Sequence, residues 1–300
     1  MLQVGIFNAY YPYSLQESIA RMKKDGFSCV QLDLAFKDMD LSFDSLTKEK
    51  CRTIRDAFRD ANLPIVCISG YTNLIHPDPV KRKQNIHGVK KILEFARDLG
   101  SPYVVSETGT FNTESDWVWD PKNATEEAYE EVATTIEDLA KFAYDNGSVF
   151  LIENYVNNVI GSVDQVSRLL SDVNHPGLGL LMDPTNYFTD NNIDHIDETL
   201  NKIFNALGDK VKIAHAKDCM RAVDTLEKHA NIDASESHSF RGAGAVELPA
   251  PGLGNLNYDL YLERLAKLHP NIPIIIEHLE EEDIPRAKTF LDNKLKAVGV

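Results

Sequence analysis

Eight short apolar runs recur along the chain, and each is followed by a polar loop and a segment with helical periodicity. The runs are too short for helices, are rich in Val and Ile, and are apolar at both odd and even positions. Parallel strands that are covered on both faces have this character. The predicted strands are VGIF (4–7), CVQLDL (29–34), PIVCIS (64–69), YVVSET (103–108), VFLIEN (149–154), GLGLLMD (177–183), VKIAHAKD (211–218) and PIIIEH (273–278).

Amphipathic segments between these runs predict helices. The first begins at Ser14 with Glu17 three residues later, the pattern of a capping box, and ends before Gly26. Eight alternations of strand and helix predict an α/β fold, a single (β/α)8 TIM barrel, with a doubly wound open sheet as the alternative. No repeat or linker divides the sequence, so we expect one domain over residues 1–300. The predicted helices cover 14–24, 47–61, 79–99, 125–146, 162–173, 195–207, 257–268 and 283–297.

Two predicted connections are long, namely 109–124 after the fourth strand and 219–256 after the seventh. Both follow the carboxyl end of a strand, and barrel enzymes build their active sites at that end. The second connection contains His229, His238 and Arg241, which are candidates for additional contacts with a substrate.

Composition narrows the classes of partner. The formal net charge is −15, and such an acidic chain repels the phosphate backbone of nucleic acids. None of the four cysteines has C-x-x-C spacing, which argues against a zinc ribbon or a redox dithiol. The sequence shows neither a signal peptide nor an apolar run of about 18 residues. We therefore expect a cytoplasmic protein without nucleic-acid or membrane partners.

Four predicted strands end in a side chain that can bind a metal ion. Residues two and four positions before each of these ends suit a barrel interior, for example Leu151 and Val149, or Ile275 and Pro273. Because side chains alternate along a strand, all four ends can point together at the top of one barrel. The four candidate ligands are Glu153, Asp183, His215 and Glu277.

Three carboxylates and one imidazole suit one divalent ion such as Mn, Mg, Co or Zn. Such an ion would also compensate anions that are costly to bury together. Taken singly, each residue has another interpretation, because strand-end carboxylates often cap loops and a lone histidine is often a core residue. His278 has the opposite parity to Glu277, so we expect it to point away from the metal.

Several motifs resemble one known family. LIENY, MDPTNYF, HAKD and IIIEH, with PGLGN before the last helix pair, resemble the xylose isomerase-like barrels and, within them, the sugar phosphate isomerase/epimerase group. Residues 73–105 are also similar to the third helix and fourth strand of that group. The resemblance implies one divalent metal bound by Glu153, Asp183, His215 and Glu277.

The resemblance also implies a mechanism. In the ketose 3-epimerases of this group the metal binds the substrate carbonyl and a neighbouring hydroxyl, which stabilises a cis-enediolate. Glu153 would remove a proton on one face of the substrate and Glu277 would return one on the other face. Asp218 and Arg221 match an acidic residue and a substrate-binding arginine of the same group.

Further polar and aromatic residues are predicted at the substrate. Asn186 stands where the ketose 3-epimerases carry a histidine, and its amide can hydrogen-bond a hydroxyl group. The complete set of predicted substrate contacts is Arg221, Asp218, Asn186, His76, Trp117 and Lys217. We also expect an aromatic wall at the same rim, formed by Phe7, Tyr10, Tyr11, Tyr71, Trp117, Trp119, Tyr155 and Tyr187.

The leading hypothesis is a metal-dependent isomerase or epimerase of a keto-sugar or related polyol ketone, with a homodimer or homotetramer expected by analogy. An inosose dehydratase-like lyase on the same metal site is the alternative, and its substrate would be derived from inositol. A sugar- or metal-binding barrel without turnover is a third hypothesis. An abasic-site endonuclease is a less favoured hypothesis. Relatives with that activity use three metals, and His76 matches one of their ligands. Glu107 and Asn186 stand where two further histidine ligands are expected, which argues against this activity.

Overall fold

A computed structural model of the chain describes residues 2–222 and 246–300. Within these residues, eight parallel strands close into a barrel in the order β1-β10-β7-β6-β5-β4-β3-β2. The closed barrel confirms the predicted (β/α)8 fold and excludes the open sheet. The barrel strands are β1 (Gln3–Phe7), β2 (Cys29–Leu32), β3 (Ile65–Ser69), β4 (Tyr103–Glu107), β5 (Val149–Glu153), β6 (Leu178–Met182), β7 (Val211–Ala216) and β10 (Pro273–Ile276).

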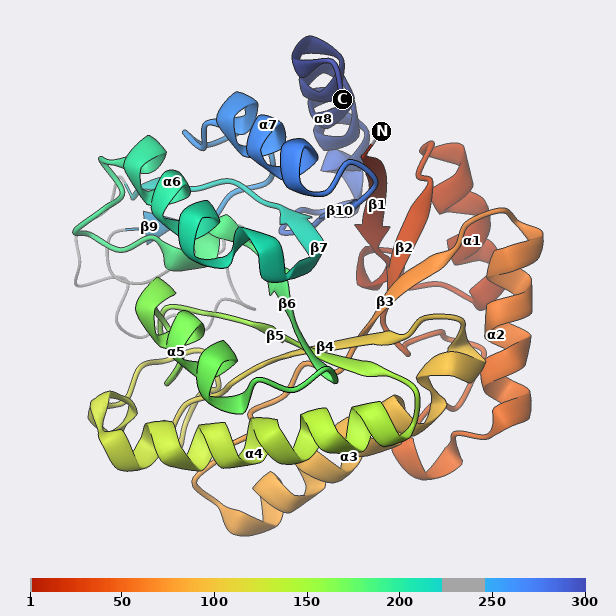
Figure 1. Cartoon of the computed structure of the whole chain (residues 1–300). Helices are drawn as coiled ribbons and strands as arrows, with labels where there is room; N and C mark the ends of the chain where they lie inside the picture. Colours follow the sequence, from red (N-terminus) through yellow and green to blue (C-terminus); the bar gives the residue numbers. More distant parts are fainter. Residues whose placement is uncertain (1, 223–245) are drawn as a thin grey trace.

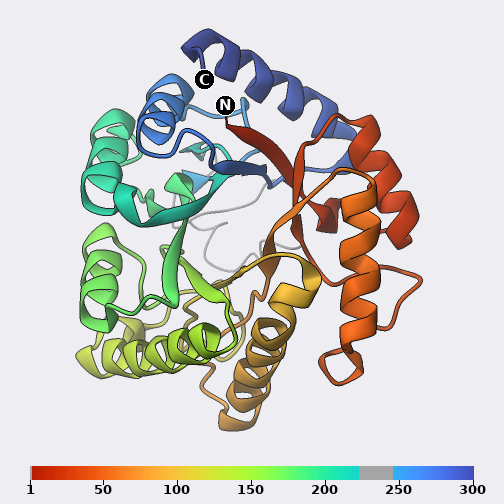
Figure 2. The same ribbon diagram turned by 45° about the vertical axis from the view of Figure 1, so that its right-hand side comes forward.

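The eight α-helices of the described part form a ring around the barrel (Figures 1 and 2). Their bounds agree with the predicted ranges to within one residue, because most predicted ranges included the N-cap residue. The helices are α1 (Leu15–Lys24), α2 (Lys48–Asp60), α3 (Pro79–Leu99), α4 (Glu126–Asp145), α5 (Val163–Val173), α6 (Ile196–Leu207), α7 (Tyr258–Leu268) and α8 (Ile284–Val298). Among the residues placed, no helix is both long and apolar enough to cross a membrane.

The capping box predicted at α1 forms only in part. Ser14 accepts a hydrogen bond from the backbone N–H of Glu17, but the Glu17 carboxylate pairs with Arg21 one turn further on. The reciprocal pair of bonds occurs instead at α5, between Ser162 and Gln165. A nearby arginine therefore outweighs the local preference of Glu17 for the N-cap backbone.

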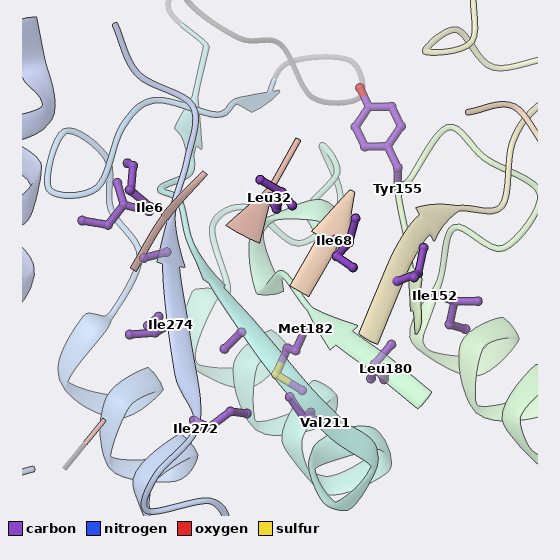
Figure 3. Close-up of a cluster of buried hydrophobic side chains, with 14 of the residues drawn as sticks. Ile6, Leu32, Ile68, Ile152, Tyr155, Leu180, Met182, Val211, Ile272 and Ile274 are labelled. Carbon is purple, nitrogen blue, oxygen red and sulfur yellow. The ribbon is translucent and has the colours of Figure 1, made fainter. Parts of the chain in front are cut away.

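The two faces of the barrel strands are buried in different cores. One face packs against the helices, and Figure 3 shows Ile6, Leu32, Ile68, Ile152, Leu180 and Ile274 in that layer. The other face fills the barrel with a separate cluster of buried residues, which is Cys29, Cys67, Val105, Leu151, Leu181, Ile213 and Ile275. The second cluster contains Leu151, Leu181, Ile213 and Ile275, the residues two positions before the four candidate ligands, so the alternation is confirmed at these positions. Val211, four positions before His215, packs in the other core.

The connection after β7 contains a short pair of antiparallel strands that was not predicted from the sequence. β8 (Met220–Arg221) pairs with β9 (Val246–Glu247), so two segments that are distant in sequence lie together beside the barrel. Strands of two residues have no periodicity that a sequence pattern can detect. His229, His238 and Arg241 lie outside the described residues.

Gly5 on β1 marks a place where the barrel interior leaves no room for a side chain. A Cβ atom at Gly5 would lie 2.6 Å from Cδ1 of Ile275 and 2.7 Å from Sγ of Cys29. Both contacts are shorter than carbon and sulfur atoms tolerate, so the interior is packed around the missing side chain.

We expect Gly5→Ala to lower the free energy of unfolding by about 1–3 kcal/mol, because the added methyl group overpacks the interior. Urea denaturation of the purified variant measures this change. The double variant Gly5→Ala/Ile275→Val removes the clashing Cδ1 methyl and should recover part of the loss. Wild-type stability in Gly5→Ala would contradict the packing described above.

Candidate metal and substrate site

The four predicted ligands converge at the carboxyl ends of four successive barrel strands. Glu153 ends β5, His215 lies in β7, and Asp183 and Glu277 directly follow β6 and β10. All four side chains are buried, and one ligand atom from each lies within 4.8 Å of the others. The geometry therefore allows these four residues to hold one metal ion, as the shared parity of the strand ends predicted.

Gln31 determines how His215 faces this cluster. Nε2 of His215 lies 2.9 Å from Oε1 of Gln31, while the amide nitrogen of Gln31 donates to Ser69 and Tyr71. The amide oxygen can only accept, so Nε2 carries the hydrogen. Nδ1 is then the atom directed at the carboxylates, 3.1 Å from Oε1 of Glu277 and 3.3 Å from Oε1 of Glu153.

Lys217 is buried among the ligands. Its ammonium group lies 2.7 Å from Oδ2 of Asp183 and 3.0 Å from Oε1 of Glu277, and it donates a hydrogen bond of 2.9 Å to Oδ1 of Asn186. The Asn186 amide in turn donates to Oε1 of Glu153 at 2.9 Å. Lys217 and Asn186 thus connect three of the four ligands.

The remaining carboxylate oxygens also have defined partners. Tyr71 donates its hydroxyl hydrogen to Oε2 of Glu153. Oδ1 of Asp183 accepts hydrogen bonds from the backbone N–H and the hydroxyl of Thr185, at 2.8 and 2.7 Å. These contacts fix the orientation of the carboxylates, as hydrogen bonds to metal ligands do in characterised sites.

The charges of the cluster shift its pKa values. Burial opposes the charged form of His215, but Glu277 and Glu153 outweigh it and raise the pKa of the imidazole to about 10. Burial also opposes ionisation of Glu277, yet His215 and Lys217 hold its pKa well below the usual range. Burial raises the pKa of Asp183 to about 6, although Lys217 opposes this effect. A protonated His215 and the Lys217 ammonium therefore stabilise the carboxylates in this structure.

The donor set fits a divalent ion. Nδ1 of His215 makes no hydrogen bond with any described residue, and Oδ2 of Asp183 makes none either although it faces Lys217. Both atoms face opposite charges within the cluster and lack an aligned hydrogen-bond partner, so both are atoms that a metal ion can bind. A metal ion bound there would replace the Nδ1 proton, because imidazole ligates in its neutral form.

A cavity of about 880 Å³ opens above the cluster. Glu153 and Glu277 form part of its floor together with Lys217 and Asn186. Trp117 also lines it and packs edge-to-face against Tyr155, with ring centroids 6.1 Å apart. Three of the predicted substrate contacts, Asn186, Lys217 and Trp117, therefore lie at the cavity.

The other three predicted substrate contacts lie elsewhere. Arg221 is exposed and pairs with Asp194 at 2.6 Å. Asp218 is buried and accepts backbone hydrogen bonds from Cys219, Gly252 and Leu256, so it holds the connection to α7. His76 accepts a hydrogen bond from the backbone N–H of Asp78 through Nδ1. None of the three lines the cavity.

His278 lies outside the set of four ligands, but its side chain does not leave the cavity. Its Nε2 atom is 3.5 Å from Nζ of Lys217. Alternation of side chains applies only within a strand, and β10 ends at Ile276. His278 has a left-handed backbone with φ of 60°, which turns its imidazole back toward the cavity.

Five of the eight predicted aromatic residues line the cavity, namely Phe7, Tyr10, Tyr71, Trp117 and Tyr155. Tyr11 is instead a core residue whose hydroxyl donates to Asp25. Trp119 and Tyr187 line a separate depression outside the barrel mouth.

Three residues have roles in the site that were not predicted: Gln31 was missed, Glu107 was assigned no role, and Tyr71 was expected only in the aromatic wall. Gln31 and Tyr71 orient ligands, and Glu107 lines the cavity beside Glu153, its register partner on the adjacent strand β5. Burial, with Glu153 close by, raises the pKa of Glu107 well above its usual value. The alternation of side chains along a strand could have identified two of them, because Gln31 and Glu107 are polar residues at interior positions of β2 and β4.

Comparison with known proteins agrees with this architecture. The model of the xylose isomerase-like TIM barrel family matches residues 19–294. No curated protein matches the sequence.

Solved structures with similar folds cover almost the entire chain. A D-tagatose 3-epimerase-like protein has a TM-score of 0.71 at 18% identity, covering 99% of this chain and 98% of that one. The probable 3-DHS dehydratase AsbF of Bacillus anthracis has a TM-score of 0.70 at 14% identity, with 100% and 99% coverage. A xylose isomerase-like TIM barrel protein from Mycobacterium smegmatis, solved in complex with magnesium, has a TM-score of 0.68 at 15% identity, with 99% and 96% coverage.

We expect Gln31→Met to weaken metal binding by about 10–100-fold, because His215 loses the partner that directs Nδ1 into the cluster. Titration calorimetry with Mn²⁺ measures the affinity. Gln165→Met makes the same exchange at the start of α5, far from the ligands in the fold, and should bind as the wild type does. An unchanged affinity in Gln31→Met would show that the Gln31 contact does not orient the imidazole.

Lys217→Met should lower the stability of the protein in chelator by about 3–5 kcal/mol, because it leaves buried carboxylates without their counter-charge. Added Mn²⁺ should then raise the melting temperature more in the variant than in the wild type. Thermal unfolding with EDTA or with Mn²⁺ measures both effects. Lys210→Met, in an exposed pair with Asp209, is the control and should change little.

Proposed function

Because this chain belongs to the xylose isomerase-like TIM barrel family, we propose that it is a divalent-metal-dependent isomerase or epimerase of a keto-sugar or related polyol ketone. One observation carries the proposal. Glu153 and Glu277, from strands separated by β6 and β7, approach the same nitrogen of His215 within 3.3 Å, and both also line the cavity. Two carboxylates around one small volume suit proton removal and proton return at a single carbon.

The two glutamates have different partners. Both oxygens of Glu153 accept hydrogen bonds, from Asn186 and Tyr71, so its carboxylate has a fixed direction. Glu277 faces His215 and Lys217, whose positive charges favour its carboxylate form. Before it can deliver a proton, Glu277 therefore has to take one up from solvent through the cavity that it lines. In one reaction direction Glu153 takes the proton beside the carbonyl and Glu277 delivers one, and in the reverse direction the roles exchange.

The residues around the glutamates complete the proposed site. A divalent ion held by Glu153, Asp183, His215 and Glu277 would polarise the substrate carbonyl and stabilise the negative charge that develops there. Trp117 and Tyr155 form an aromatic wall over the cavity, which limits the access of water to the reacting carbon. Lys217 and Asn186 are positioned to hydrogen-bond substrate oxygens.

A dehydratase is the second candidate, favoured by the fold similarity to the probable 3-DHS dehydratase AsbF. Glu153 would remove the same proton, and Glu277 would protonate a departing β-hydroxyl group. Asn186 also favours the dehydratase. It lies beside Glu153 and Lys217, and its amide can hold a hydroxyl group there but cannot carry protons.

Proton exchange with deuterated solvent tests the proposal. The protein with Mn²⁺ is incubated with ketohexoses or with 2-keto-inositol, and NMR detects deuterium at the carbon beside the carbonyl. Interconversion of the ketohexoses identifies an isomerase or epimerase, and loss of water from 2-keto-inositol identifies the dehydratase.

Glu153→Gln and Glu277→Gln should each reduce exchange by about 10²–10⁴-fold, since the amide cannot accept the proton. Saturating Mn²⁺ compensates for any loss of metal affinity. Glu263→Gln on the exposed side of α7 provides the control and should exchange at the wild-type rate. Wild-type exchange in either glutamine variant would refute the acid/base roles.

A further inference from the structure

We infer that the substrate of this site carries a compact apolar substituent beside its sugar or polyol part, and this inference rests on the proposed function. The cavity above the ligands has two chemically different ends. One end contains the glutamates, Lys217 and Asn186. The other lies between the connection from β2 to α2 and the helix α3, and its wall is formed by Leu34, Leu41, Phe43, Val89 and Ile92.

The apolar end offers fewer hydrogen-bonding groups to a ligand than the end with the glutamates, and Asp33, next to Leu34, is the carboxyl group on this side of the cavity. Among its polar neighbours, Asn85 donates its amide hydrogen to the backbone oxygen of Asn73, and the Ser42 hydroxyl donates to Asp40. The backbone N–H of Thr72 is bound to Ser106. A sugar placed there could use Asp33 but would leave most of its hydroxyl groups without partners, which is costly. The sugar part therefore fits the end with the ligands, where Glu107 adds a further carboxyl group.

Phe43 is held in place for contact with a ligand. A Cβ atom at Gly88 would lie 2.4 Å from Cε2 of Phe43, so the ring lies directly on the backbone of α3. Glycine inside a helix is unfavourable by about 0.5–1 kcal/mol relative to alanine, and here it makes room for this ring. Phe43 is nevertheless 44% exposed and faces the cavity, so an apolar group bound there would remove it from water.

The volume of the cavity agrees with a substrate that has both a polar and an apolar part. Sites for drug-sized molecules have volumes of about 300–1,000 Å³. At about 880 Å³ the cavity lies near the upper end of that range and extends well beyond the four ligands. Because the glutamates and Phe43 line one continuous space, a single molecule can occupy both ends. A keto-sugar joined to a phenyl-sized group has the required division into a polar and an apolar part.

Binding of two matched probes tests this inference without turnover. Phenyl β-D-glucoside and methyl β-D-glucoside differ only in the substituent, and calorimetry with the Mn²⁺-loaded protein measures each affinity. We expect the phenyl glycoside to bind about tenfold more tightly or better, the factor that 1.4 kcal/mol of apolar contact produces. Equal affinities, or no binding of the phenyl glycoside, would overturn the inference.

Variants locate the preference on the protein. Phe43→Ser should bring the ratio of the two affinities close to one and leave the methyl glycoside unaffected. Gly88→Ala should also reduce the ratio, because the added methyl group displaces the ring while favouring the helix. Tyr144→Ser removes another exposed aromatic ring, on α4, and should keep the full ratio. A full ratio in both Phe43→Ser and Gly88→Ala would place the apolar contact elsewhere and refute the assignment.

The comparison of the two glycosides and the proton-exchange test can fail separately. Proton exchange with simple ketoses together with equal glycoside affinities would retain the proposed function and reject the apolar substituent. A clear phenyl preference without exchange on any ketone would reject the proposed function while supporting the assignment of the apolar end.

Discussion

The site depends on the compensation of charges that are buried together. Glu153, Asp183 and Glu277 are almost inaccessible to solvent, and the cost of burying three carboxylates would be prohibitive without cations. The Nδ1 side of His215 and the ammonium of Lys217 occupy the space between them. The same space and the same ligand atoms suit a divalent ion. Stability of the barrel top and its capacity for chemistry are therefore two results of one electrostatic arrangement.

The barrel below explains why the arrangement is possible. Interior residues such as Leu151 and Ile275 form a packed layer beneath Glu153 and Glu277, and the absent side chain of Gly5 lets this layer close. Ligands that stand on such a layer have little freedom to spread apart. The hydrogen bonds from Tyr71 and Asn186 then fix the carboxylate of Glu153. Close packing therefore determines where Glu153 lies, and hydrogen bonds determine the direction of its carboxylate.

The fold and the four ligands could be predicted from the sequence because both follow from periodicity. Strand parity extends from Leu151 to Glu153 and from Ile213 to His215 without interruption. Parity still held for Asp183 and Glu277, one residue past the ends of β6 and β10, but it failed at His278, where the left-handed backbone reversed the expected direction of the side chain. The contact of Gln31 with His215 was also inaccessible, since β2 and β7 are not neighbours in the barrel. A motif match likewise could not show that Asp218 points into the backbone of its own loop.

The hydrogen bonds of Asp218 limit which changes of sequence the barrel mouth can accept. Its carboxylate gathers three backbone N–H groups, and a Cβ atom at Gly254 would meet Oδ1 of Asp218 at 2.4 Å. The turn at 250–256 is thus tied to the residue next to Lys217, so a change in its length would shift the charged centre itself. We expect insertions and exchanges to be better tolerated in the connections after β2 and β4, which line the cavity. The Asp218 contacts thus constrain one side of the barrel mouth more than the other.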